Sequence, residues 1–254
     1  MRLNTVQIIP VIGLPVIKKG DDLSMLIFQA AEKQGTPIQN GDIIVITHVI
    51  VARAEGNIID LKTITPSEFA KSIAKSTKKD PRLVEVVLRE SKSIVRMSNG
   101  KLITETKQGL ICANSGIDKS NVPGSTVIAL LPEDSDKSAQ TIRHNMYKNS
   151  GKDVAIIVSD THGRPLRKGE INIALGTSGF EPLRDRRGEK DLFGYKIKTK
   201  RTAIADELAS AAELVIGQTN EGIPVAIIKG YAYPKSETAK AIKLLRAPKD
   251  DLFI

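Results

Sequence analysis

Apolar residues recur at helical spacing in several segments of the chain. The segment Asp21–Gly35 places its aliphatic side chains on one face, and its last glycine is a typical helix stop. Residues 65–68, Thr-Pro-Ser-Glu, predict the start of a helix that runs to about Ser76. Thr65 would be its N-cap, Pro66 its first helical residue and Glu68 the acid of a capping box. Asp80 and Pro81 predict the start of another helix. Further helices are expected over Asp136–Asn149, Thr202–Ile216 and Ser236–Arg246.

Runs rich in Ile, Val and Thr predict strands between these helices. The expected strands are Ile43–Val51, Ile58–Leu61, Ser93–Met97, Lys101–Thr106, Thr126–Leu131, Val154–Val158 and Val225–Ile228. Strands and helices come in groups rather than in strict alternation, which favours an α+β fold over a doubly wound parallel sheet. We expect one catalytic unit over residues 1–254, with two interleaved lobes of mixed or antiparallel sheet, tentatively 1–135 and 136–254.

Charge and composition narrow the possible ligands. The net charge of +9 is compatible with nucleic acid, acidic lipid or a small polyanion. Aromatic residues make up 4% of the chain and Trp is absent, which disfavours a stacking platform for single-stranded nucleic acid. Basic residues gather in the ranges 164–168 and 184–190, near possible site residues, and a phosphate-rich ligand in a cleft explains this better than a nucleic-acid groove does. A solvated basic surface is the alternative.

The sequence predicts a cytoplasmic protein that does not enter a membrane. Its single cysteine, Cys112, has no partner for an intramolecular disulfide and lies in an apolar stretch typical of a buried thiol. The first residues lack the pattern of a cleavable signal. The longest apolar stretch, Ile43–Ala52, is much shorter than a membrane span.

A candidate metal site follows the apolar run Val154–Val158. The chain continues there as Ser159, Asp160, Thr161, His162 and Gly163. A carboxylate and a hydroxyl at the edge of a sheet are the hard oxygen ligands that Mg²⁺ and Mn²⁺ prefer. The alternative is that Asp160 caps a turn and Thr161 bonds the backbone locally.

Two further polar loops could converge on the same cleft. Asn114–Val122 and Gly217–Gly222 each adjoin an apolar strand or helix, although their Asn, Ser, Gly and Asp residues are also ordinary turn residues. The sequence has neither a G-x-x-x-x-G-K-[ST] loop nor a G-x-G-x-x-G turn, so a P-loop or Rossmann site is not expected. With one cysteine and three histidines, it also lacks the motifs of common zinc sites.

Two rival functions remain at this point. Ser159–Gly163 also resembles the first metal motif of calcineurin-like phosphoesterases, but the further histidine motifs of that family are missing because no histidine follows His162. RNA binding without catalysis is the second rival, on the basis of charge.

Taken together, the motifs resemble the coenzyme F420-0:γ-glutamyl ligase family over nearly the whole chain. The individual matches are weak, whereas their order and spacing are specific. They are Gly13–Ile17, Gly20–Leu23, Asn40–Asp42, Ala54–Gly56, Ser115–Asp118, Ser120–Val122, Ser159–Thr161, Gly163-Arg164, Ala174, Gly176, Ser178-Gly179, Arg187-Gly188, Lys190–Leu192, Gly194, Ala205–Glu207 and Gly222–Pro224.

The resemblance implies a set of site residues. Metal ligands would be Asp118, Asp160, Thr161 and Gln218, with the two aspartates as the catalytic residues. GTP contacts would come from Leu14, Pro15, Val16, Ile17, His48, Val49, Arg53, Asn121, Ile216, Gly217, Gln218, Thr219, Asn220, Glu221, Gly222 and Ile223. His48 stands where relatives commonly have a small hydroxylated residue and Arg53 where they commonly have Lys, so nucleotide preference is open.

The resemblance also implies the reaction. GTP would drive ligation of L-glutamate to F420-0, giving F420-1 and longer γ-glutamyl forms through an acyl phosphate. Two divalent cations (Mg²⁺ or Mn²⁺), a monovalent cation (K⁺) and a homodimer are expected, with no nucleic acid as partner. The alternatives are a metal-dependent phosphoesterase and a nucleotide-dependent acid-amine ligase with another acceptor.

Overall fold

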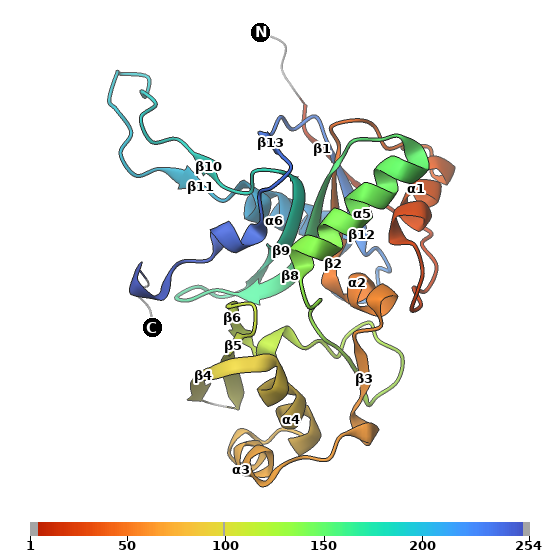
Figure 1. The fold of residues 1–254 in the computed structure, drawn as a ribbon, viewed down its shortest axis with the longest axis vertical. Coiled ribbons are helices and arrows are strands. Elements are labelled where there is room, and N and C mark those ends of the chain that lie inside the picture. Colours follow the sequence, from red (N-terminus) through yellow and green to blue (C-terminus); the bar gives the residue numbers. More distant parts are fainter. Residues whose placement is uncertain (1–4, 99, 251–254) are drawn as a thin grey trace.

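A six-stranded mixed sheet forms the centre of the protein (Figure 1). The structure is a computed structural model that describes residues 5–98 and 100–250. In the central sheet β2 and β8 are parallel, and the other neighbouring pairs are antiparallel. The strand order is β1 (Gln7–Pro10), β12 (Val225–Lys229), β2 (Ile43–Thr47), β8 (Ala155–Gly163), β9 (Glu170–Phe180) and β13 (Lys235–Ser236).

Helices cover both faces of this sheet because its inner strands are apolar on both sides. Ile44 and Ile46 of β2 pack under α1 (Leu23–Lys33), α2 (His48–Glu55) and α5 (Ser135–Ser150). Ile43 and Val45 point the other way, toward α6 (Ile204–Ile216). The strictly alternating side chains of one strand therefore supply two cores.

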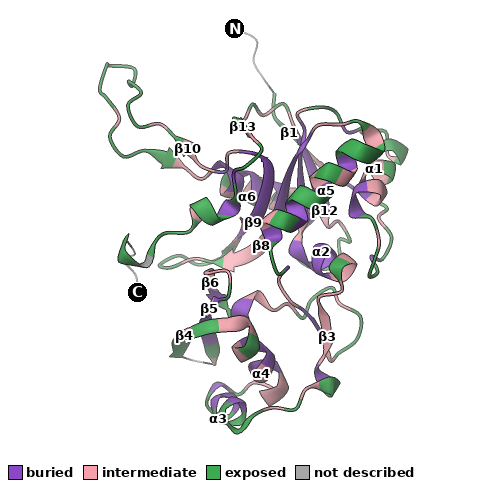
Figure 2. Ribbon diagram, in the orientation of Figure 1, coloured by how far each residue is buried: buried purple, intermediate pink, exposed green. Residues whose placement is uncertain are grey.

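A smaller lobe lies below the central sheet in the view of Figure 1. Its core joins Leu61, Ile73, Val84 and Leu102, among other residues, and is separate from the cores of the sheet. Figure 2 shows buried segments in α3, α4 and β5 of this lobe. Its elements are β3 (Ile58–Asp60), the 3₁₀ turn Leu61–Thr63, α3 (Glu68–Thr77), α4 (Pro81–Glu90), β4 (Ser91–Ser98), β5 (Lys101–Thr106), β6 (Ile111–Ala113), the 3₁₀ turn Asn114–Gly116 and β7 (Val127–Ala129).

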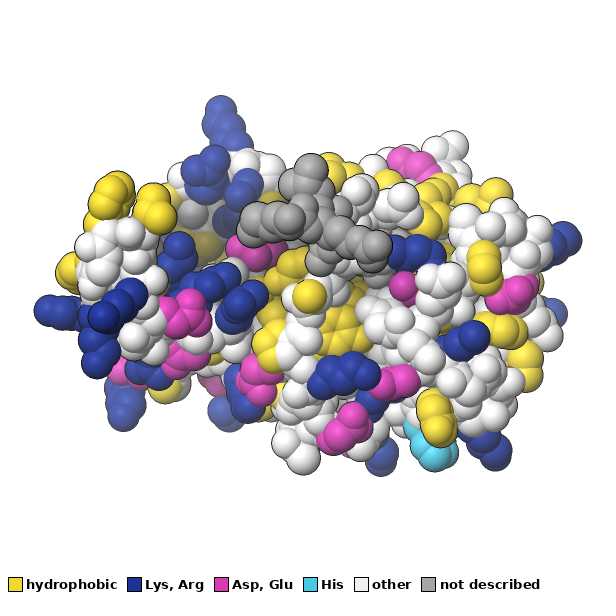
Figure 3. All heavy atoms as spheres, turned by 90° about the horizontal axis from the view of Figure 1, so that it is seen from above, with side chains coloured by type: hydrophobic (Ala, Val, Ile, Leu, Met, Phe, Trp, Pro, Cys, Tyr) yellow, Lys and Arg dark blue, Asp and Glu magenta, His cyan; other side chains and the backbone are white. Residues whose placement is uncertain are grey.

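A two-stranded arm projects from the body between β10 (Arg184–Asp185) and β11 (Arg201–Thr202). Leu192 and Phe193 near its tip are 91% and 92% exposed. Lys and Arg side chains gather on the side of the molecule to which the arm extends (Figure 3). The range 184–190, expected near the site, lies on this arm, and its Arg186 and Arg187 pair locally with Glu189 and Asp185.

Three predicted segments were wrong in part. The strand expected over Ile43–Val51 ends at Thr47, and the chain turns into α2. Helix α3 is capped by Ser67, whose Oγ accepts from the Ala70 amide at 3.2 Å, and not by Thr65. The helix expected over Ser236–Arg246 is reduced to β13 and a 3₁₀ turn at Ala241–Leu244. The helical pattern of this last segment failed because pairing with β9 and the hydrogen bond to Asp136 of α5 determine its backbone conformation.

The site motif also lies in a different element from the one expected. The strand expected to end at Val158 continues through residues 159–163, which pair with β9, so the alternative of a turn at Asp160 is not observed. Strand β9 itself was not predicted, nor were β1, β6 and the short strands β10, β11 and β13. The predicted starts at Asp80 for α4 and near Asp21 for α1 are confirmed, with Asp80 and Asp22 as the caps.

The α+β class with mixed and antiparallel sheets is confirmed, and the fold is not of the Rossmann type. The division near residue 136 stays a prediction, and the central sheet takes strands from both sides of it. Within the described ranges, no helix is long and apolar enough to cross a membrane.

The close approach of β9 to α5 gives the first prediction. A Cβ on Gly176 would lie 2.1 Å from the backbone oxygen of Ser135, at the start of α5. We expect Gly176→Ala to lower the free energy of unfolding by about 1–3 kcal/mol, because neither backbone can yield cheaply. Urea unfolding measures this, with Gly163→Ala as the control, since that Cβ meets nothing within 4 Å. Equal stability of the two variants would contradict the prediction.

Candidate functional site

The candidate site is a pocket of about 300 Å³ at the edge of the sheet where β2 ends beside Ser159 of β8. These two strands are parallel with Thr47 opposite Ser159, so the residues that follow, His48 and Asp160, lie side by side. Strand β12 runs the opposite way, and the loop that precedes it therefore reaches the same edge. Carboxyl ends of parallel strands are the usual position for ligands in sheets covered by helices.

His48 and Asp160 form a buried ion pair in this pocket. His48 Nδ1 lies 3.1 Å from Asp160 Oδ1, and the two side chains are 2% and 19% exposed. Burial alone lowers the pKa of His48, but the charges of Asp160 and Asp118 and the hydrogen bond to Asp160 outweigh it and hold the pKa above its ordinary value. His48 thus fixes Oδ1 of Asp160, which also accepts from the Thr161 amide at 2.7 Å.

The start of α2 offers backbone donors to the pocket. Its N-cap, Thr47, makes no side-chain capping bond, and the first helical residues, including Val49 and Ile50, line the cavity. Uncapped amides and the helix dipole favour an anion at this position. Arg53 from the same helix also lines the pocket, and its Nη1 donates to the Asn121 carbonyl at 3.3 Å.

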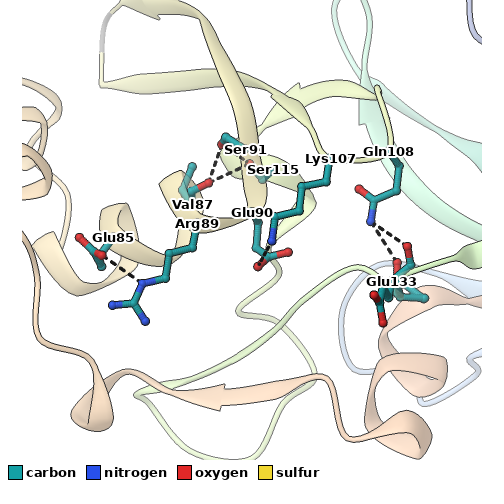
Figure 4. A network of polar contacts seen from close by, with 10 residues as sticks. Glu85, Val87, Arg89, Glu90, Ser91, Lys107, Gln108, Ser115 and Glu133 are labelled. Carbon is teal, nitrogen blue, oxygen red and sulfur yellow. Dashed lines mark hydrogen bonds and ion pairs between the residues drawn. The ribbon is translucent and has the colours of Figure 1, made fainter.

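The smaller lobe contributes Asp118. Its backbone pairs with Ala129, and its carboxylate accepts from the amide and hydroxyl of Ser120 at 2.6 and 2.9 Å. The preceding turn is held by Ser115, a buried residue with φ of 56°. Ser115 Oγ lies 2.8 Å from Ser91 Oγ (Figure 4), and the lobe core therefore sets the position of Asp118.

Thr161, Asn172, Glu213 and Gln218 form a second polar cluster in the pocket. Gln218 Nε2 donates to Thr161 Oγ1 at 3.0 Å and to Glu213, and Asn172 Nδ2 donates to the other oxygen of Glu213. Burial, followed by the charges of Asp160 and Glu221, raises the pKa of Glu213 despite its bond from Gln218. A β-bulge between Val158 and Ser159 precedes this part of β8 and β9.

The loop 217–223 closes the pocket beside this cluster. Gly217 has φ of 77°, and a Cβ there would lie 2.4 Å from Glu221 Cδ, so this turn requires glycine. Hydrogen bonds from its own backbone amide and from the Thr219 amide lower the pKa of Glu221. The bond from the Thr219 amide is 2.7 Å long. The loop is thus held by bonds within itself.

The pocket brings together nearly all the residues that the resemblance implied. Asp118, Asp160, Thr161 and Gln218 line it, as do the implied GTP residues from Leu14–Ile17, from α2 and from loop 217–223. Asn220 does not line it, and neither does the basic range 164–168. The roles of the implied residues as metal ligands and GTP contacts stay predictions.

The donor chemistry of the pocket suits hard cations. Its wall carries four carboxylates against one arginine and one histidine, and its remaining donors are hydroxyl and amide oxygens. His48 Nε2, Ser159 Oγ and Asn172 Oδ1 are buried and without hydrogen-bond partners. Among the described residues, no three His, Cys, Asp or Glu side chains are grouped closely enough to hold a metal by themselves, so neutral oxygens would have to complete any ligand set.

Seven residues of the pocket wall were not assigned to the site from the sequence: Thr47, Ile50, Ser120, Ser159, Asn172, Glu213 and Pro224. Asn172 lies in an alternating run, Ile171-Asn172-Ile173, whose period of two would have indicated β9. Glu213 lies in the last turn of α6, after the acids Asp206 and Glu207 of its first turn.

The fold and pocket define an α+β protein with a polar, acid-lined cleft at the end of its central sheet. The sequence model of the family F420-0:Gamma-glutamyl ligase matches residues 11–230, and the chain belongs to this family. It is 45% identical over 249 residues to the coenzyme F420:L-glutamate ligase of Methanothermobacter thermautotrophicus, covering 98% of each chain. The proteins of the same name from Methanopyrus kandleri and Methanocaldococcus jannaschii are 46% and 47% identical, with 99% and 96% of this chain and 98% and 96% of theirs covered.

The ion pair of His48 gives a prediction for pH. A raised pKa in the folded state means that the pair stabilises the fold fully below about pH 6.5, the unfolded value, and loses this effect as pH rises through the folded pKa. In metal-free protein we expect His48→Gln to cost more stability at pH 6 than at pH 9. Urea unfolding of both proteins at each pH measures the difference. A difference that does not change with pH would show that folding does not shift the pKa of His48.

Proposed function

We propose that this protein ligates L-glutamate to coenzyme F420-0 with GTP as the energy source. Family membership and the names of the relatives support the acceptor and the amino acid. The observation that carries the proposal is the meeting of Asp118 and Asp160, from separate lobes, beside the uncapped start of α2. Carboxylates next to free amides suit a phosphate that is bound together with cations.

Electrostatics explains why such a pocket needs cations. A triphosphate and a carboxylate repel each other, by roughly 4 kcal/mol for unit charges about 4 Å apart at an effective dielectric near 20. Asp118, Asp160, Thr161 and Gln218 would hold two divalent cations, Mg²⁺ or Mn²⁺. When bound, these cations neutralise the phosphate oxygens and align them for transfer.

The residues of the chain then position the substrates. The amides at the start of α2 and the guanidinium of Arg53 would bind phosphate oxygens of GTP, and loop 217–223 with Leu14–Ile17 would enclose the nucleoside. The terminal carboxylate of F420-0 attacks the γ-phosphorus, GDP leaves, and an acyl phosphate forms. The glutamate amine attacks the acyl carbon, phosphate leaves, and the amine proton passes to solvent or to a base. Holding the reactants together supplies much of the acceleration.

The finer features of the proposal come from the family resemblance. They are a K⁺ site, a homodimer, cytoplasmic location and repeated addition of glutamate. Arg53 binds phosphate with a planar fork rather than a point charge, so it preserves anion binding while changing its geometry.

The function is tested by a direct assay. Purified protein with GTP, L-glutamate, F420-0, K⁺ and Mn²⁺ or Mg²⁺ should release GDP and phosphate as the coenzyme gains glutamate. Mass spectra over time identify the product and count the glutamates, and ATP in place of GTP measures nucleotide preference. Glutamylation of a different acid would indicate a ligase with another acceptor. Cleavage of a phosphodiester without ligation would instead support the phosphoesterase alternative.

Asp160→Asn tests the metal role of this carboxylate. The substitution keeps the shape and removes the charge, so we expect turnover to fall about 10²-fold or more and the Mn²⁺ activation curve to shift to higher concentration. Asp80→Asn is the matched control, because Asp80 caps α4 and pairs with Arg82 outside the pocket, and Asn is an equally good cap. Normal turnover and an unchanged activation curve for Asp160→Asn would remove this residue from the mechanism.

A further inference from the structure

Asn172 lies directly beside a residue that is expected to bind metal. In the register of β8 and β9, Asn172 is opposite Thr161, and both side chains line the pocket. Asn172 is 2% exposed, so its side chain is held within the protein rather than in solvent.

Glu213 determines how two amide groups are turned. Its two carboxylate oxygens accept from the Nδ2 of Asn172 and the Nε2 of Gln218. An ionised carboxylate accepts hydrogen bonds and does not donate, so each amide must present its NH₂ group to Glu213. The carbonyl oxygens of both amides are therefore directed away from Glu213, and both residues line the pocket.

The oxygen of Asn172 has no hydrogen-bond partner. Asn172 Oδ1 is buried and unpaired, and leaving a buried acceptor unsatisfied costs about 1–3 kcal/mol. A group that pairs with Asn172 Oδ1 must attract an amide oxygen. Two more neutral oxygens lie nearby, Thr161 Oγ1 and Gln218 Oε1, which are 3.2 Å apart. Neutral oxygens gathered around acids are typical ligands of hard divalent cations.

We propose that Asn172 is a further oxygen ligand of the cation shared by Thr161 and Gln218, and that Glu213 is the positioning residue that turns both amide oxygens toward it. The proposal rests on the metal site of the proposed function. We assign Glu213 the positioning role because each of its oxygens accepts a hydrogen bond from one of the two amides.

The proposal predicts a loss of metal binding that does not depend on activity. Mn²⁺ is titrated into the full-length protein in the presence of GTP without F420-0, and free Mn²⁺ is followed by electron paramagnetic resonance. We expect Asn172→Leu and Glu213→Gln each to raise the Kd for Mn²⁺ about 10-fold to 100-fold, as changes around metal ligands do. Glu207→Gln, an exposed acid on the same helix, is the control and should bind as the wild type does.

A double substitution separates positioning from general loss of structure. If Glu213 acts through the two amides, Glu213→Gln should cost less in the Asn172→Leu background than in the wild type. Thermal unfolding checks that each variant is folded. If Asn172→Leu does not fold, Asn172→Ala replaces it, because it also removes the oxygen and is expected to weaken Mn²⁺ binding in the same way.

The outcomes distinguish this inference from the proposed function. Wild-type affinity in both single variants, with glutamylation intact, would overturn the inference and leave the ligase assignment standing. Fully additive losses would overturn the positioning role of Glu213. A wild-type protein that binds no Mn²⁺ and adds no glutamate would overturn the proposed function, and the inference with it.

Discussion

The parallel pairing of β2 and β8 is the constraint on which the site depends. In a sheet of otherwise antiparallel neighbours, this pair brings two carboxyl ends to the same edge. The segment after β2 turns into α2 at this edge, whereas β8 continues along the pocket. The first residue of α2, His48, therefore lies beside Asp160 of β8. An antiparallel arrangement of the same strands would place these residues at opposite ends of the sheet.

The second requirement is that the two separately packed lobes hold Asp118 and Asp160 beside the same pocket. Asp118 stands on a turn held by the small lobe through Ser115, whereas Asp160 stands on the central sheet. The bond from Arg53 to Asn121 and the packing of Ala129 against Val49 and Ala52 of α2 tie the two lobes together at the pocket. A cation bound between the aspartates would add a further link, so metal binding and lobe position are expected to be coupled.

The sequence predicted those parts of the fold that local chemistry decides. Helices with clear caps, such as α4 after Asp80, and the apolar strands of the sheet follow from spacing and turn residues. Helix α2 was missed because Ile-Val-Thr-rich residues fit a strand equally well, and the helix forms where β2 meets the end of its parallel partner. Asp160 was found from a motif, whereas Glu213 belongs to the site through hydrogen bonds between distant segments, which no local pattern contains.

The distribution of charge reconciles a basic protein with an acidic pocket. The chain has a net charge of +9, yet the pocket wall holds Asp118, Asp160, Glu213 and Glu221. Positive charge therefore lies mainly outside, on surfaces such as the arm, where it attracts polyanions and raises the rate of encounter. Inside, an anion is stable only when cations or protonated groups accompany it, as His48 already accompanies Asp160. Attraction and binding are thus separate tasks, and under the proposed function the second would depend on cations.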